Sequence, residues 1–223
     1  MTKPWMSSSR ASASNGLPLR WPTWKCFPEH PSFLGYNLLD RHTNRGGSMN
    51  GNIWQGEKIR LRGVEPEDWK IFMSWNLDTE AARCSYFIPF PQSSVDVQKT
   101  IQRMAEHRGE DDCYTLVMEN RDGALVGIIN THDANRRAGT FSYGVAVQRI
   151  YQNRGYAAEA IRLVLGYYFN ELRYQKCNVS VYAFNQVSIH LHEKLGFVLE
   201  GRLRRCVFTD GQYHDILLYG MTV

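Results

Sequence analysis

The hydrophobic pattern of the sequence changes at Gly155, and this change constrains the fold more than any other feature. Before it lie three short β-type runs, at residues 114–119, 125–130 and 141–147, the first two joined by the turn sequence Asn-Arg-Asp-Gly. After it, apolar residues recur at helical spacing as far as Tyr168. An antiparallel meander that leads into a helix, followed by another strand at residues 179–182, predicts a single α+β domain.

The remaining elements follow from local signals. Further strands are expected at residues 58–62, 203–209 and 213–221. Further helices are expected at residues 65–76, 93–104 and 186–195, the last ended by Gly196. The whole pattern predicts a mixed, mostly antiparallel sheet of about six to seven strands, flanked by about four helices.

The first 48 residues differ from the rest of the chain. They contain five of the eight prolines and show no sustained period of 2 or 3.6. No apolar run of signal-peptide length is present among them. We expect residues 1–48 to be a disordered N-terminal extension or an upstream extension, and we favour the second, with Met49 starting the functional protein. Residues 49–223 are the expected domain.

Charge and cysteine content exclude several classes of function. Residues 1–48 carry six Lys/Arg and two Asp/Glu, whereas residues 49–223 carry twenty of each sign. A neutral domain lacks the charge that nucleic-acid binding requires, and no apolar run is long enough to span a bilayer. The five cysteines lie far apart without a C-x-x-C pair, which argues against a zinc site and suits a reduced, cytoplasmic protein.

The chemistry of the chain is indicated by the six residues at 152–157, Gln-Asn-Arg-Gly-Tyr-Ala. A turn with glycine and small residues lets backbone N–H groups approach an anion, and the helix that follows adds its positive N-terminal dipole. A diphosphate fits such a turn, and Arg154 can add a charged contact. The sequence is neither a P-loop nor a Rossmann fingerprint. The alternative is an ordinary strand-to-helix turn.

A second series of residues makes the pattern specific. Asn185-Gln186-Val187-Ser188 is followed by Gly196-Phe197, Glu200-Gly201 and the run Gly211-x-Tyr213-x-Asp215. Together with the upstream turn, this series resembles the GCN5-related N-acetyltransferase (GNAT) superfamily, and within it the ribosomal-protein-alanine N-acetyltransferase (RimJ/RimL-like) branch. The resemblance covers roughly residues 59–221. It implies a GNAT-type sheet that opens into a V-shaped cleft for acetyl-CoA.

The resemblance also implies which residues bind acetyl-CoA. The pantetheine arm is expected along the strand residues Val145, Ala146 and Val147 and near Asn185. The diphosphate is expected on Gln152, Asn153, Arg154, Gly155, Tyr156 and Ala157. A purely structural role is the alternative to donor binding for each residue: the two valines could be core residues, and Asn185 could be only the N-cap of its helix.

The expected reaction moves an acetyl group from acetyl-CoA to a primary amine, by direct attack on the thioester. At about 100° per residue, Asn185, Ser188 and His192 share one helix face, whereas His190 lies elsewhere. Many GNAT enzymes have a tyrosine where His192 stands, while the ribosomal-protein-modifying branch offers a serine where Ser188 stands. Ser188 is our first choice for proton donor to the leaving thiolate, and His192 our second.

No general base is assigned. The related enzymes often carry a glutamate where this chain has Ser142, and Glu200 and Asp215 are explained equally well as residues that join strands and loops. Tyr213 could line the cleft. A base acting through water, or a backbone carbonyl, fulfils the same role.

The acceptor, a protein N-terminus or a small-molecule amine, is expected to enter over the region before the meander. Aromatic and apolar residues there suit a peptide or an apolar amine, although such runs also form cores: Trp75, Tyr86, Phe87, Ile88 and Phe90. The run Glu110-Asp111-Asp112 suits a polyamine or is a solvated loop. Two other functions remain as alternatives, a non-catalytic acyl-CoA-binding sensor or partner module and an unrelated interaction domain.

Overall fold

We describe a computed structural model, in which residues 51–85, 88–107, 109 and 111–223 are described. Residues 1–50, and with them the predicted N-terminal extension, lie outside these ranges. In the described part of the chain, no helix combines the length and the apolar character needed to cross a membrane.

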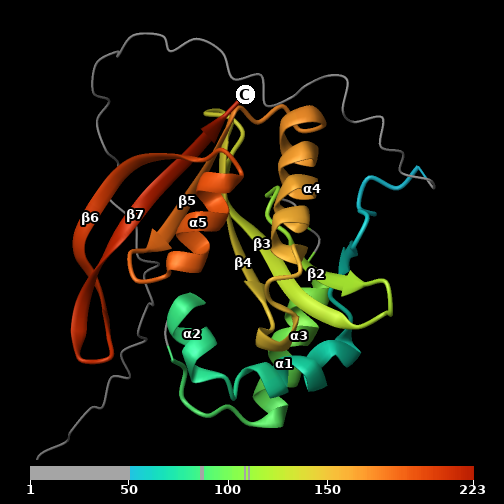
Figure 1. Cartoon of the computed structure of the whole chain (residues 1–223). Helices are drawn as coiled ribbons and strands as arrows, with labels where there is room; N and C mark the ends of the chain where they lie inside the picture. The colour runs from blue at the N-terminus through green and yellow to red at the C-terminus, as the bar shows by residue number, and fades with distance from the viewer. Residues whose placement is uncertain (1–50, 86–87, 108, 110) are drawn as a thin grey trace, which may run out of the picture. The chain divides into compact units, whose positions relative to one another are not determined.

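A seven-stranded sheet forms the centre, in the order β1-β2-β3-β4-β5-β7-β6 (Figure 1). Its strands are β1 Ile59–Gly63, β2 Thr115–Asn120, β3 Leu125–Asn135, β4 Thr140–Val147, β5 Lys176–Tyr182, β6 Val198–Thr209 and β7 Gln212–Thr222. All neighbours pair antiparallel except β4 and β5, which pair parallel. The predicted mixed and mostly antiparallel sheet is confirmed, with the upper of the two expected strand numbers.

Five α-helices flank the sheet among the described residues, one more than expected. They are α1 Trp69–Trp75, α2 Thr79–Ser85, α3 Ser94–Glu106, α4 Tyr156–Asn170 and α5 Gln186–Lys194, with single 3-10 turns at Pro66–Asp68 and Arg149–Tyr151. The additional helix is α2, whose sequence Thr-Glu-Ala-Ala-Arg-Cys-Ser has no large apolar residue. Hydrophobic periodicity therefore gives no signal for it.

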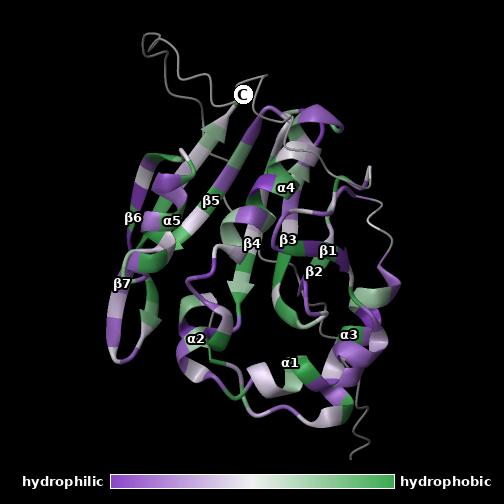
Figure 2. Cartoon of the chain, turned by 45° about the vertical axis from the view of Figure 1, so that its right-hand side comes forward, coloured by the Kyte–Doolittle hydropathy of each residue, from purple (hydrophilic) through white to green (hydrophobic). Residues whose placement is uncertain are grey.

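Each face of the sheet has its own hydrophobic core. Leu125 and Val126 are neighbours in β3 whose side chains point to opposite faces, as successive strand residues do. Val126 joins the core under α4 and α5, where Phe141 stacks on Tyr168 with ring centroids 4.1 Å apart. Leu125 joins a smaller core with Ile101 of α3 and residues of α1. Figure 2 shows hydrophobic residues along β3 and β4, between these helices.

Candidate active site

The sheet opens where β4 and β5 stop pairing. These strands are in register only from Thr140 opposite Lys176 to Ser142 opposite Asn178. Beyond that point β4 continues to Val147 and β5 to Tyr182, and the strands diverge (Figure 1). We call this divergence of the two strands the V-shaped opening. Because β5 no longer pairs with it, one edge of β4 has no partner strand in the described structure from Tyr143 onward.

Three of the predicted donor-binding residues lie on this edge. Val145, Ala146 and Val147 are each half-buried and pair with β3 on their other side. A free strand edge presents a row of backbone N–H and C=O groups to an extended ligand. The structure therefore places these residues on the side of β4 that borders the opening.

The turn predicted to hold a diphosphate follows directly. Gln152 leads into it and donates from Nε2 to the carbonyl oxygen of Val147 at 3.1 Å. Asn153 and Gly155 both have positive φ, 61° and 85°, and Gly155 is the N-cap of α4. Glu159 N donates to Gly155 O at 3.1 Å. The N–H groups that precede it, those of Tyr156, Ala157 and Ala158, belong to the first turn of the helix, where intrahelical partners are lacking.

Lys58, which the sequence analysis did not single out, crosses this turn. Its Nζ donates to the carbonyl oxygen of Arg154 at 3.0 Å. A Cβ on Gly155 would lie 2.9 Å from the same Nζ. Glycine is thus required at position 155 both by its positive φ and by the close approach of the lysine. Arg154 donates to the carbonyl oxygen of Ile150 at 3.2 Å.

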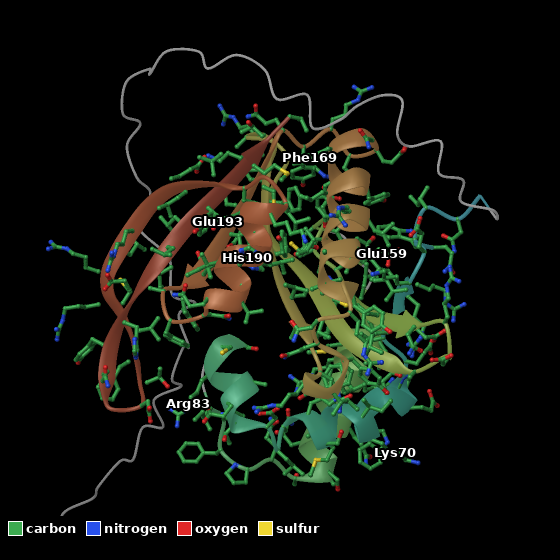
Figure 3. All side chains as sticks on the ribbon, in the orientation of Figure 1. Lys70, Arg83, Glu159, Phe169, His190 and Glu193 are labelled. Atoms are coloured by element: carbon green, nitrogen blue, oxygen red, sulfur yellow. The ribbon has the colours of Figure 1, made fainter. Side chains whose placement is uncertain are left out.

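The three residues predicted to share a face of α5 are joined in the structure. Asn185 caps the helix, and its Oδ1 accepts from the Ser188 N–H at 3.1 Å. The Nδ1 of His192 lies 2.7 Å from the carbonyl oxygen of Ser188 and 3.3 Å from its Oγ. His190 is exposed and lies apart from them, as expected (Figure 3).

His192 is buried in an aromatic environment. Only 1% of it is exposed, and its ring lies 5.9 Å from that of Tyr143 and 5.2 Å from that of Phe197. Burial lowers the pKa of His192, and the hydrogen bond to the Ser188 carbonyl opposes this shift in part. A carbonyl cannot donate, so Nδ1 carries the proton and the neutral ring has its lone pair on Nε2. That Nε2 has no hydrogen-bond partner within the described residues.

The carboxylates considered as bases have structural partners. Glu200 forms an ion pair with Lys176 at 2.7 Å. Asp215 accepts from the backbone N–H of Arg205 at 2.8 Å and pairs with Arg202 at 2.5 Å. These contacts, the backbone one first, lower the pKa of Asp215. Both carboxylates therefore join strands and loops, the structural alternative stated above. Ser142 is half-buried in β4, and Tyr213 is exposed in β7.

The residues considered for the acceptor are dispersed. Trp75 packs on Phe72 at 5.0 Å next to the smaller core, whereas Ile88 and Phe90 are exposed. Tyr86, Phe87 and Glu110 lie outside the described residues. Asp112 is buried and forms an ion pair with Arg136. It also accepts a hydrogen bond from the hydroxyl of Tyr174 at 2.8 Å. Its place is near the start of β4, the end of the sheet away from the opening.

Helix α2 connects the two sides of the opening, and no pattern in the sequence indicates this connection. At one end, Asp78 pairs with Arg149 in the turn after β4, at 2.6 Å. At the other, Arg83 donates to Thr209 Oγ1 at 3.1 Å, at the tip of the β6–β7 hairpin. Figure 3 labels Arg83 on this helix. These contacts join residues 71 and 126 positions apart, so no local signal predicts them.

The open sheet, the turn at the start of α4 and Ser188 on the neighbouring helix lie around one opening. Residues 58–198 match the family model described as acetyltransferase (GNAT) domain. The chain belongs to the GNAT acetyltransferase family, and it is an acetyl-CoA-dependent acyltransferase.

Two relatives are similar to this chain in sequence, and a solved structure shares its fold. The chain is 43% identical to the SPbeta prophage-derived N-acetyltransferase YokL of Bacillus subtilis, over 76% of this chain and 92% of that protein. It is 26% identical to the spermidine N(1)-acetyltransferase of Escherichia coli K12, over 71% and 83%. The structure of RimL, the ribosomal L7/L12 alpha-N-protein acetyltransferase in complex with coenzyme A, shares the fold with a TM-score of 0.68, at 14% identity over 75% and 96%.

Proposed function

We propose that this protein is an N-acetyltransferase of the RimJ/RimL-like branch that moves an acetyl group from acetyl-CoA to a primary amine in the cytoplasm. Residues 49–223 are the proposed catalytic domain. The observation that carries the proposal is the position of the V-shaped opening, which lies between the free edge of β4, the turn at 152–157 and the start of α5.

The residues at the opening fit the donor by shape and by charge. The edge of β4 at Val145, Ala146 and Val147 suits the amide groups of the pantetheine arm, and Asn185 lies across from it at the start of α5. The turn from Gln152 to Ala157 supports the diphosphate in two ways. The positive φ of Asn153 and Gly155 turns the backbone into the helix, and the helix start supplies N–H groups and a positive dipole.

The acetyl transfer forms a C–N bond and breaks a C–S bond, so the amine loses a proton and the thiolate gains one. Ser188 is the proposed proton donor to the sulfur. His192 Nδ1–H donates to the carbonyl oxygen of Ser188, so the hydroxyl proton of Ser188 is not held by that nitrogen. We assign His192 the role of fixing Ser188 at the helix start, through the two contacts of its Nδ1.

A protein N-terminus is the acceptor that the residues support better than a polyamine. A polyamine needs clustered carboxylates, and the acidic run that suggested such a cluster contributes the buried Asp112 to an ion pair with the exposed Arg136 instead. Relatives of both kinds are present, a spermidine acetyltransferase by sequence and a ribosomal-protein acetyltransferase by fold.

The test is to mix the full chain with acetyl-CoA and pooled amines, read by mass spectrometry. The pools are peptides with free N-termini, polyamines and aminoglycosides. We expect acetylated peptides and little acetylated polyamine. Acetylated polyamine alone would exclude the protein N-terminus as acceptor, and bound acetyl-CoA without a product in any pool would favour the sensor function.

A further inference from the structure

Three aromatic side chains gather at the end of β5, on one side of the V-shaped opening. The ring centroid of Phe184 lies 5.5 Å from that of Tyr182 and 4.7 Å from that of His214. We call these three residues the aromatic cluster. Asn185, the N-cap of α5, comes directly after Phe184. The aromatic cluster therefore lies beside the start of the helix that carries Ser188.

His214 lies on the face of the sheet that α4 and α5 do not cover. Leu217 and Tyr219 of β7 join the core under these two helices, and successive strand residues point to opposite faces. Because His214 is an odd number of positions from both, its side chain points away from that core. The backbone fixes its place at the end of β5, since the Ala183 N–H donates to the carbonyl oxygen of Asp215 at 2.9 Å.

The face of His214 is the face from which an amine can approach the donor. The turn at 152–157 begins α4 and Asn185 begins α5, so the proposed donor contacts lie on the side of these helices. A nucleophile has to come from a side that the donor does not fill. In the β6–β7 hairpin His214 is opposite Val207, two positions before Thr209, which accepts from Arg83 of α2 (Figure 1). Helix α2 therefore lies next to this approach.

The imidazole of His214 is available to accept a proton. It is half-buried, and neither ring nitrogen has a hydrogen-bond partner among the described residues. The carboxylates on the neighbouring elements form ion pairs instead: Glu80 and Asp210 with Arg83, and Asp215 with Arg202. Histidine is the commonest general base in enzymes, because a neutral imidazole accepts a proton near neutral pH.

We propose that His214 is the general base that deprotonates the acceptor amine, and that the rings of Tyr182 and Phe184 attract the incoming ammonium. The ammonium gives one proton to the imidazole, which releases it to water. The nitrogen lone pair then forms the C–N bond, and the C–S bond breaks with its electron pair on sulfur. The nitrogen loses its second proton to water, while Ser188 protonates the sulfur and regains a proton from water. The inference rests on the proposed function and names the base for its reaction.

The test measures CoA release by the full chain, with the amine pool, peptides or polyamines, that the wild type acetylates. We expect His214→Gln to lower kcat about a hundredfold and to leave the affinity for acetyl-CoA unchanged. His214→Ala should lose as much, and added imidazole should restore part of the lost rate. The matched control is His190→Ala, because His190 is exposed on α5. This variant should keep the wild-type kcat and show no response to imidazole.

Three results would overturn the inference. If both His214 variants keep the wild-type kcat, another group takes the proton. If they lose activity that imidazole does not restore, while thermal unfolding shows them folded, His214 has a structural role. If the wild type acetylates no amine, the proposed function fails and the inference fails with it. That last result is distinct from the first two, in which the wild type is active.

Discussion

Gly155 begins α4 with a φ of 85°, and a Cβ at this position would lie 2.9 Å from Lys58 Nζ. Alanine has to adopt a left-handed backbone conformation there and displace the lysine. We expect Gly155→Ala to lower the free energy of unfolding by about 1–2 kcal/mol, measured by urea denaturation.

Gly166 gives the matched control in the middle of the same helix. A Cβ there would meet only the side chain of Asn170, at 4.0 Å, and its φ is not positive. Gly166→Ala should therefore stabilise the protein by up to about 1 kcal/mol. Equal effects of the two substitutions would contradict this interpretation of the turn.

Ser188 lies at the start of α5, where its hydroxyl is the proposed proton donor. Ser188→Ala should lower kcat about a hundredfold and leave KM for acetyl-CoA nearly unchanged, measured by steady-state release of CoA. The control is Ser94→Ala, an exposed serine at the start of α3. A Ser188→Ala enzyme with wild-type kcat would assign the proton transfer to another group.

His192 makes stability dependent on pH. Burial lowers its pKa in the folded state below the unfolded value of about 6.5. Below that pH the unfolded chain binds a proton that the folded chain does not, so the free energy of unfolding falls as the pH falls through this range. Urea denaturation at several pH values between 7.5 and 5.5 measures this slope.

The slope should become shallower in His192→Asn and stay as in the wild type in His190→Asn, because His190 is exposed on the same helix. If the two variants keep the same slope, the pH dependence arises from other groups.

At the scale of elements, α2 is a short helix that polar contacts hold in place. Seven residues are too few for a stable isolated helix. Asp78 caps α2 through the N–H of Ala81 and pairs with Arg149. Asp78→Asn keeps an N-capping side chain and removes the charge, so hydrogen exchange over residues 79–85 should rise about fivefold.

Asp96→Asn in α3 is the control for α2, because Asp96 is exposed and also lies in the first turn of its helix. It should leave exchange in residues 79–85 unchanged. Protection of α2 that is equal in both variants would show that apolar packing, and not the ion pair, holds the helix.

The elements with a clear local pattern were predictable from the sequence. The meander, the helix at Gly155 and the last two strands all have alternation, turn residues or a helical stripe, and all are found. Helix α2 and the extension of β3 to Asn135 were not expected. Helix α2 depends on Arg149, which is distant in sequence, so a local pattern contains no information on that contact. The extension of β3 is largely polar, and it forms a strand by pairing with the neighbouring β4, as far as Asn135 opposite Thr140.

In the candidate site too, some features were predictable from the sequence and others were not. The turn at 152–157 and the shared face of Asn185, Ser188 and His192 follow from short spacings, and the structure shows both arrangements. The burial of His192 and the path of Lys58 across Gly155 depend on packing between remote segments. No sequence spacing predicts those.

At the scale of the whole molecule, the division of charge matches the proposed domain. The net charge of +4 belongs to residues 1–48, and residues 49–223 are neutral. A domain that recognises its donor through one turn and one strand edge needs no large basic surface. We therefore expect residues 49–223 to bind acetyl-CoA as the full chain does.

The central claim is that acetyl-CoA binds at the turn that begins α4, and native mass spectrometry tests it most directly. The full chain and residues 49–223 should each bind one acetyl-CoA. Gly155→Glu should remain folded and lose the ligand, because it places a side chain and a negative charge at the proposed diphosphate site. Binding that persists in folded Gly155→Glu, or no binding by the wild type, would contradict the account.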